Sequence, residues 1–231
     1  DSTGHAVSAT VPVTVRPDEP PSVAIGAPPA GSTFVSGTTV PVTYTVSDDV
    51  GVVTLELGLG TAQARISNPS GTGTATLVAP VVGAAQSLPL SARATDASGH
   101  VVETSVPVTV KPDESPTVAI LSPASGANVL SGSTVPVSYS ASDDVSVASL
   151  VLQLGSSSVT LVRPPAVGTT SLRAPAVTVV EPIVLSATAT DSAGHVTQTS
   201  VTLSARPDDP PTFSLAAPTD ASEDRFVARA L

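Results

Sequence analysis

The stretch Ser47–Gly60 has the sequence SDDVGVVTLELGLG, and the stretch Ser142–Gly155, 95 residues later, has the sequence SDDVSVASLVLQLG. In both, a serine is followed by an acidic pair and then by a segment in which apolar and smaller or polar residues alternate. When the chain is aligned with itself at this shift, nearly half of the residues between Pro21 and Ser115 are identical to their partners, and no gap is needed. A fixed period of this length predicts a tandem of similar structural units.

Each unit contains short segments with a period of two. In the first unit the alternating segments are Val40–Val46, Val53–Leu59, Leu88–Ala94 and Val106–Val110. Three more strands are expected at residues 22–27, near 62–66 and near 74–79. Alternation with many β-branched residues is typical of half-buried antiparallel strands. Seven such strands in one repeat predict an all-β fold made of two-sheet sandwiches.

Prolines and the repeat register indicate where units begin and end. Arg16–Pro21 and Lys111–Pro116 are short proline-rich linkers, and Pro107 is expected to place the last strand at a sheet edge, where proline is tolerated. The expected divisions are residues 1–17 (last strand of a preceding repeat), 18–112 and 113–207 (complete repeats), and 208–231 (linker and first strand of a following repeat).

The two ends of the chain align with parts of a repeat. Val7–Val15 corresponds to a last strand and Thr212–Pro218 to a first strand. A strand without its sheet would expose unpaired backbone groups, so these ends predict a segment of a longer repeat protein. Residues Thr219–Leu231 depart from the repeat, and the sequence assigns them no role.

Composition narrows the functions open to this chain. The formal net charge of −10 disfavours a nucleic-acid partner, because binding the phosphate backbone needs clustered Lys and Arg. There are no cysteines, so neither a disulfide nor a thiolate metal site can form. No apolar run reaches the length of a membrane span, and no signal peptide is recognisable.

Three pieces of the repeat resemble the bacterial immunoglobulin-like repeats of large surface and secreted proteins. They are the opening PSVAI from Pro21, the strand and loop VPVTYTVSDD from Val40, and the turn ATDASGH from Ala94. The resemblance covers the complete and partial units and ends after Pro218. It implies tandem seven-stranded immunoglobulin-like β-sandwiches joined by short Pro-rich linkers, in a protein that is extracellular or on the bacterial cell surface.

Acidic residues recur at three places in each unit. Thirteen of the 19 lie in the linkers, after the second strand, or at the start of the turn before the last strand. Loops of an immunoglobulin sandwich gather at its two ends, so these carboxylates are expected to converge between domains. Carboxylates held together repel one another, and Ca²⁺, which takes 6–8 oxygen ligands, would offset that repulsion. The candidate calcium ligands are Asp18, Glu19, Asp48, Asp49 and Asp96 at one junction and Asp113, Glu114, Asp143, Asp144 and Asp191 at the next.

Ordinary turn chemistry explains the same acidic residues without a metal. Asp side chains accept hydrogen bonds from nearby backbone groups, and the glycine of a D-x-x-G turn can supply a positive φ. The spacing also lacks the D-x-D-x-D-G density of a dedicated calcium loop. Both interpretations stay open: no cofactor is required, and Ca²⁺ at the domain junctions is the candidate.

Histidine and tyrosine are the other residues with reactive side chains that recur. His5, His100 and His195 occupy one turn position in successive units, where the family usually has Asn. We expect each to bond backbone or a neighbouring Asp, because no Ser or Cys nucleophile with an orienting acid accompanies them. Tyr44 and Tyr139 are expected in the core with the hydroxyl at its rim. The sequence therefore predicts that this protein is not an enzyme.

Two functions remain. The stiff linkers favour a structural repeat segment, that is, a spacer, stalk or filament, whose partners are neighbouring repeats of the same polypeptide and copies of itself in a fibre. The alternative is an adhesin module that binds a cell-surface ligand through loops or sheet edges. The stretches that differ most between units are the candidates for such contacts: Thr61–Ser70 against Ser156–Pro165, and Gly83–Pro89 against Thr178–Val184.

Overall fold

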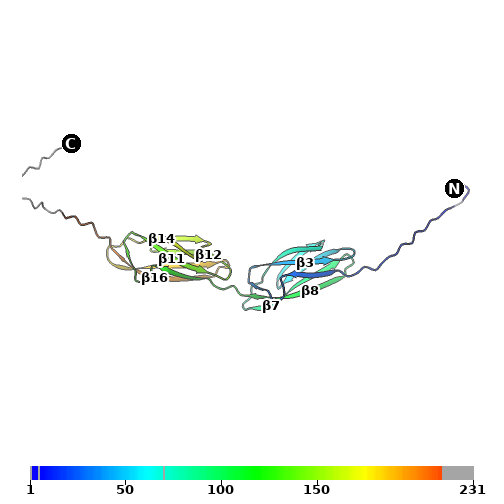
Figure 1. Ribbon diagram of the computed structural model, residues 1–231, viewed down its shortest axis with the longest axis horizontal. Coiled ribbons are helices and arrows are strands. Elements are labelled where there is room, and N and C mark those ends of the chain that lie inside the picture. Colours follow the sequence, from blue (N-terminus) through cyan, green and yellow to red (C-terminus); the bar gives the residue numbers. More distant parts are fainter. Residues whose placement is uncertain (1, 5, 70, 215–231) are drawn as a thin grey trace, which may run out of the picture.

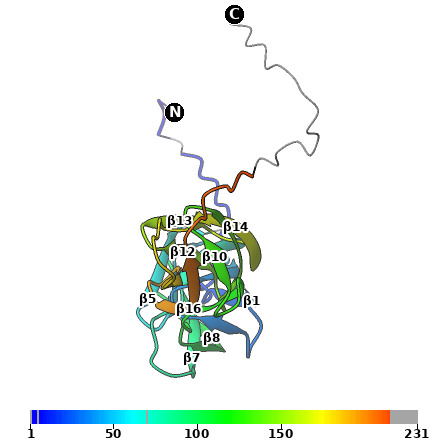
Figure 2. The same ribbon diagram turned by 90° about the vertical axis from the view of Figure 1, so that its left-hand side faces the viewer.

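The computed structural model describes residues 2–4, 6–69 and 71–214, and the regular secondary structure within these ranges is entirely β. Residues 22–111 and 117–206 form two sandwiches that follow one another along the long axis of the molecule (Figure 1). Viewed along that axis, the two sandwiches overlap (Figure 2). The predicted tandem of all-β sandwiches is confirmed.

The first sandwich is built from one sheet of three strands and one of five. The three-stranded sheet has the order β1 (Ser22–Ala27), β3 (Thr39–Ser47), β6 (Gly71–Val78). The five-stranded sheet has the order β2 (Thr33–Val35), β8 (Val101–Lys111), β7 (Gln86–Asp96), β4 (Val52–Leu59), β5 (Ala62–Ser67). All neighbouring strands are antiparallel except β2 and β8, which are parallel.

The second sandwich repeats this topology. Its three-stranded sheet has the order β14 (Val167–Arg173), β11 (Thr134–Ser142), β9 (Thr117–Ser122). Its five-stranded sheet has the order β10 (Asn128–Leu130), β16 (Val196–Arg206), β15 (Glu181–Asp191), β12 (Val147–Leu154), β13 (Ser157–Val162). Because the sheets correspond strand for strand, positions in the two sandwiches can be compared directly.

The strand count differs from the sequence prediction. Each of the seven expected strands has a counterpart, and each sandwich also has a short strand, β2 or β10, that the periodicity did not indicate. Three residues are too few to establish a period of two. The sequence predicts that the last strand is a free edge. This prediction is wrong for the C-terminal end of β8, because Thr109–Lys111 pairs with β2. Pro107 lies just before this paired part, and its carbonyl accepts a hydrogen bond from Gly31 N at 2.8 Å.

The expected end strands are not strands in the described residues. Residues 6–21 have no strand assignment, which includes Val7–Val15. A lone segment has no neighbouring backbone with which to form a ladder. Residues 212–214 also have none, and the remainder of Thr212–Pro218, together with Thr219–Leu231, lies outside the described residues.

Each sandwich closes around its own apolar core. The inward positions of β4 and β12 are leucines with exposed fractions of 0–1% (Leu55, Leu57, Leu59, Leu150, Leu152 and Leu154), and burial of each such side chain stabilises the fold by roughly 1.5–3 kcal/mol. Tyr44 and Tyr139 are buried in these cores as expected. Each lies opposite a glycine of the next strand, Gly73 or Gly168, and a Cβ there would overlap the tyrosine ring.

Candidate functional site

The acidic residues converge where the incoming linker, the loop after the second long strand and the turn before the last strand meet. In the first sandwich, Asp18 is grouped with Asp48 and Asp49 and also with Asp96 and His100; one ligand atom from each member lies within 4.8 Å of those of the others. The second sandwich has the matching groups Asp113, Asp143, Asp144 and Asp113, Asp191, His195. The linker aspartate thus belongs to both groups at each site.

In each sandwich, one oxygen of the first loop aspartate and one oxygen of the turn aspartate accept hydrogen bonds from the local backbone. Asp48 Oδ2 accepts hydrogen bonds from Val50 N at 3.2 Å and Gly51 N at 2.6 Å. Asp96 Oδ1 accepts from Ser98 N at 2.9 Å and His100 N at 2.8 Å. Asp143 and Asp191 make the corresponding bonds in the second sandwich. The turn chemistry expected from D-x-x-G is therefore present.

Other carboxylate oxygens at these sites are buried without a donor. Among the described residues, Asp18 Oδ1, Asp48 Oδ1 and Asp143 Oδ1 accept no hydrogen bond, and Asp18 Oδ2 has a nitrogen near it only at 3.3 Å, in His100. A buried polar atom without a partner costs free energy, and a charged one costs more. The group of Asp18, Asp48 and Asp49 offers only carboxylate oxygen, the donor that Ca²⁺ prefers. These residues fit a hard divalent cation.

The two turn histidines join the carboxylates to one another. His100 Nδ1 lies 2.8 Å from Asp96 Oδ2 and 3.3 Å from Asp18 Oδ2. His195 Nδ1 lies 2.9 Å from Asp191 Oδ2 and 3.0 Å from Asp113 Oδ2. As expected, the histidines bond neighbouring aspartates, and each also ties the linker to the turn.

Proximity to carboxylates shifts the titration of these groups. The hydrogen bond with Asp96 raises the pKa of His100, and the bond with Asp191 does the same for the pKa of His195. Burial acts to raise the pKa of Asp96, but its hydrogen bonds with His100 outweigh burial and leave that pKa lowered. The pKa of Asp113 is raised, first by burial and then by the charges of Asp191 and Asp144. Repulsion among the carboxylates thus contributes to the raised pKa of the linker aspartate Asp113.

A lysine, absent from the sequence-based candidates, takes part in the second site. Lys111 Nζ, at the end of β8, lies 2.9 Å from Asp144 Oδ2 in the second sandwich. Asp144 Oδ1 accepts a hydrogen bond from Glu114 N at 3.3 Å. The signal in the sequence was a basic residue at one linker position in each repeat: Arg16, Lys111 and Arg206.

The two linker glutamates differ from the aspartates in position. The carboxylates of Glu19 and Glu114 belong to none of the acidic groups found among the described residues. Glu114 instead contributes its backbone N–H to Asp144. The two sites are therefore built mainly from aspartates.

Comparison with known proteins places these sandwiches in a family. The model of a bacterial Ig domain matches residues 21–80 and 116–175, one match in each sandwich. The chain belongs to the bacterial Ig domain family. The resemblance expected from the sequence is thereby confirmed.

Solved structures similar to this bacterial Ig tandem come from several kinds of protein. Fibronectin(III)-like modules of Clostridium thermocellum CbhA are 20% identical, with 84% of this chain and 100% of that chain covered and a TM-score of 0.37. A structure from a 1.5-MDa bacterial ice-binding adhesin is 18% identical, with 83% and 66% covered and a TM-score of 0.41. A chimeric titin Z1Z2 is 16% identical, with 81% and 97% covered and a TM-score of 0.40. No curated protein matches.

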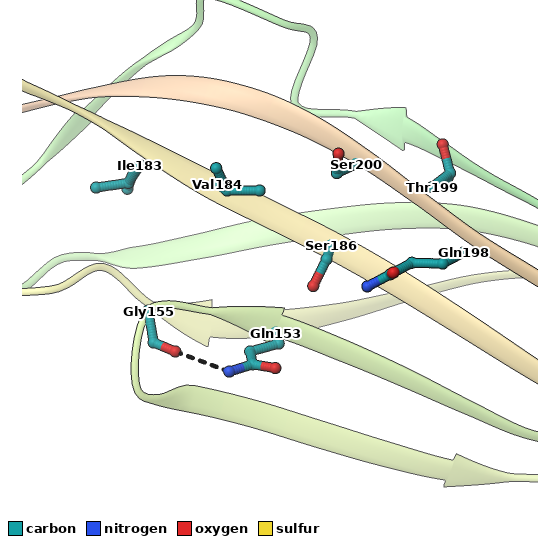
Figure 3. A pocket seen from close by; sticks show the side chains of 8 residues that line it. All are labelled: Gln153, Gly155, Ile183, Val184, Ser186, Gln198, Thr199 and Ser200. Atoms are coloured by element: carbon teal, nitrogen blue, oxygen red, sulfur yellow. Dashed lines mark hydrogen bonds between the residues drawn. The ribbon is translucent and has the colours of Figure 1, made fainter.

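The bacterial Ig tandem also presents an uncharged hollow on its second sandwich. The hollow has a volume of about 620 Å³ and lies on the outer face of β12, β15 and β16. Gln153, Ser186 and Gln198 line it, and Gln153 Nε2 donates to Gly155 O at 3.2 Å (Figure 3). Val184, from the divergent stretch Thr178–Val184, lines its rim. The described residues contain no helix that could cross a membrane.

Proposed function

We propose that this bacterial Ig tandem is a spacer, stalk or filament segment of a long bacterial extracellular or cell-surface protein. The observation that carries this proposal is the attachment of the linker to the sandwich that follows it. Asp113 is anchored by His195, Lys111 by Asp144, and Glu114 N by Asp144. The linker Lys111–Pro116 has six residues, and being tied at three of them it resists bending more than a free chain would.

The surfaces on either side of the linker support the same function. A space of about 370 Å³ is lined by Ser36–Thr39 from the first sandwich and by Asp113, Val145, Ser192 and Ala193 near the second. The two sandwiches therefore approach each other closely enough to limit their relative rotation. Repeats joined in the same way would continue with a similar geometry along a longer polypeptide.

Calcium at the sandwich ends is part of this proposal. We infer that Asp18, Asp48, Asp49 and Asp96 hold one Ca²⁺ and that Asp113, Asp143, Asp144 and Asp191 hold another, with Glu19 and Glu114 beside them in the linkers. The buried carboxylate oxygens without donors support this assignment. A bound cation would offset the repulsion that raises the pKa of Asp113 and would connect linker, loop and turn through one centre.

Small-angle scattering tests the spacer, and thermal melting in Ca²⁺ and in chelator tests the metal separately. The spacer predicts an elongated particle, each sandwich being on the order of 40 Å long from strands rising about 3.3 Å per residue. A compact, side-by-side pair would contradict it. Calcium is expected to raise the melting temperature, corresponding to about 2.7 kcal/mol at a concentration 100 times Kd. Asp49→Ala and Asp144→Ala should reduce that increase. Equal melting temperatures in Ca²⁺ and in chelator would contradict the calcium sites and leave turn hydrogen bonding as the only role of these aspartates.

A second candidate function is an adhesin module. The hollow of Figure 3 favours it, because its lining is uncharged, combines amide and hydroxyl side chains with Ile183 and Val184, and includes part of a stretch that differs between the repeats. Binding of the labelled chain to cell surfaces would be compared with that of a variant carrying Gly83–Pro89 in place of Thr178–Val184. Loss of binding by the variant alone would support the adhesin, and absence of binding by both would contradict it.

A further inference from the structure

The outer face of the first five-stranded sheet carries a row of four charged residues. Pairing places Arg65 of β5 opposite Glu56 of β4, Glu56 opposite Arg93 of β7, and Arg93 opposite Glu103 of β8. Arg65, Glu56, Arg93 and Glu103 are called the charge row below. Its members alternate in sign across four neighbouring strands, and its net charge is zero.

The charge row is accessible and only partly satisfied within the sandwich. Arg65 Nη1 lies 3.4 Å from Glu56 Oε1, and Arg93 Nη1 lies 3.2 Å from Glu56 Oε2. The side chains of Arg65, Glu56 and Arg93 remain 67%, 41% and 46% exposed. A guanidinium carries five N–H donors in a planar fork, so each arginine can bind a second carboxylate without releasing Glu56.

The residues on either side of the charge row are uncharged, and most of them have short side chains. Toward one end lie Ser67, Thr54, Thr95 and Val101, and toward the other lie Gln63, Gly58, Ser91 and Ser105. Gly58 has no side chain, and it lines a hollow of about 340 Å³ together with Gln63, Ser91 and all four members of the charge row. Long Arg and Glu side chains therefore stand above their neighbours and would be the first to meet an approaching surface.

An alternating row of even length is complementary to itself. Place a second copy face to face with the first and relate them by a two-fold axis parallel to the strands. The axis reverses the order of the row, so Arg65 meets Glu103 of the second copy and Glu56 meets Arg93 of the second copy. A two-fold axis along the row would instead place Arg on Arg and Glu on Glu, which is repulsive.

We propose that this face binds the same face of a second copy of the chain, with the two chains parallel. The chain has a net charge of −10, so two copies repel each other over most of their surfaces. The charge row is locally neutral and offers four complementary pairs. An axis parallel to the strands keeps both chains running in one direction, as parallel stalks in a bundle would.

The second sandwich lacks this feature. The residues at the corresponding positions are Thr160, Val151, Thr188 and Gln198, none of them charged. Association is therefore confined to the first sandwich and sets the register of the two chains along their length. One register is expected, because a copy displaced by one sandwich would place the charge row on this uncharged row.

Contact area predicts a weak association for a single pair. Four strands about 4.8 Å apart and four outward rows about 7 Å apart give on the order of 500 Å² per copy. For both copies together this is about 1,000 Å², which is at the low end for specific interfaces. Chains held near one another by other parts of a longer protein would bind more tightly through effective concentration. The inference rests on the proposed spacer function only for this last point.

Charge exchange tests the proposal with two double variants of the whole chain. Glu56→Lys with Glu103→Lys makes the row all basic, and Arg65→Glu with Arg93→Glu makes it all acidic. Sedimentation velocity at low salt should show association of the unmodified chain, at least about tenfold weaker association of either variant alone, and restored association of an equimolar mixture of the two. Val151→Lys with Gln198→Lys, the matched control on the second sandwich, should associate as the unmodified chain does.

Energy transfer between dyes on the two copies measures whether the paired chains are parallel or antiparallel. A dye on Thr212→Cys should transfer energy between the two copies of a parallel pair, because both labelled ends lie on the same side. An antiparallel pair separates these ends by more than two sandwich lengths and gives no transfer. An unmodified chain that stays monomeric at millimolar concentration, or a mixture that fails to associate, overturns the proposal; an elongated scattering profile of that monomer would still support the spacer.

Discussion

The inner and outer faces of the corresponding strands β4 and β12 differ in how closely they match. Inward, Leu55, Leu57 and Leu59 stand where the second sandwich has Leu150, Leu152 and Leu154, all with exposed fractions of 0–1%. Outward, Glu56 and Gly58 correspond to Val151 and Gln153. A packed interior tolerates few changes of volume, whereas an outward side chain faces solvent. The two repeats thus share a fold while offering different surfaces.

The largest effect is expected where the sandwiches are most alike. Leu55→Ala and Leu150→Ala should each destabilise their own sandwich by about 2–5 kcal/mol, since both remove a fully buried side chain and leave a cavity. Calorimetry would resolve which transition moves. If one substitution cost less than about 1 kcal/mol, the two cores would not be equivalent.

A smaller loss is expected at the glycines that face the buried tyrosines. Gly73→Ala and Gly168→Ala place a methyl group against Tyr44 or Tyr139, and overpacking of this kind costs about 1–3 kcal/mol. Gly83→Ala is the matched control, because no atom lies within 4 Å of its Cβ position. Chemical denaturation should separate the control from both test variants, and equal midpoints for all three would show that the rings move aside freely.

The sequence predicted the long strands and the acidic clusters better than the short strands and the contacts that depend on strand register or on the next sandwich. Alternation identified β3, β4 and β7 because each is long enough to show a period of two, whereas β2 has three residues. The acidic sites followed from loops meeting at sandwich ends. Lys111 was missed because its partner Asp144 belongs to the next sandwich. The charge row required the strand register, which sequence spacing alone did not provide.

Two of the three basic linker residues, Arg16 and Lys111, sharpen the comparison between sites. Lys111 ends a strand of one sandwich and pairs with Asp144 of the next, whereas Arg16 follows residues that form no strand. Lys111→Ala should widen the distribution of angles between sandwiches, with little change in the melting of either. Small-angle scattering in chelator, with Arg16→Ala as control, would detect the wider distribution. Equal profiles for the two variants would mean that the ion pair does not limit bending.

The smallest effect expected is a dependence of melting temperature on pH, and it should be common to both sandwiches. His100 and His195 have raised pKa values in the fold, so their pairing stabilises fully below the ordinary value of 6.5 and is lost as pH rises through the raised pKa. Asp96 and Asp191 have lowered pKa values, so their contribution is present above 3.8 and is lost as pH falls through the lowered pKa. Asp113 acts in the opposite sense, since its raised pKa means that ionisation opposes folding.

The directions of these pKa shifts place the greatest stability of the calcium-free protein, measured in chelator, between about pH 4 and 6.5. These limits are the ordinary pKa values of Asp and His. Melting temperature should fall modestly from pH 6 to pH 8, because the imidazolium that links each linker aspartate to its turn loses its proton. His100→Gln should flatten this slope for the first sandwich and His195→Gln for the second, each leaving the other sandwich as an internal control. A slope that survives in the double variant would assign the pH dependence to groups other than these histidines.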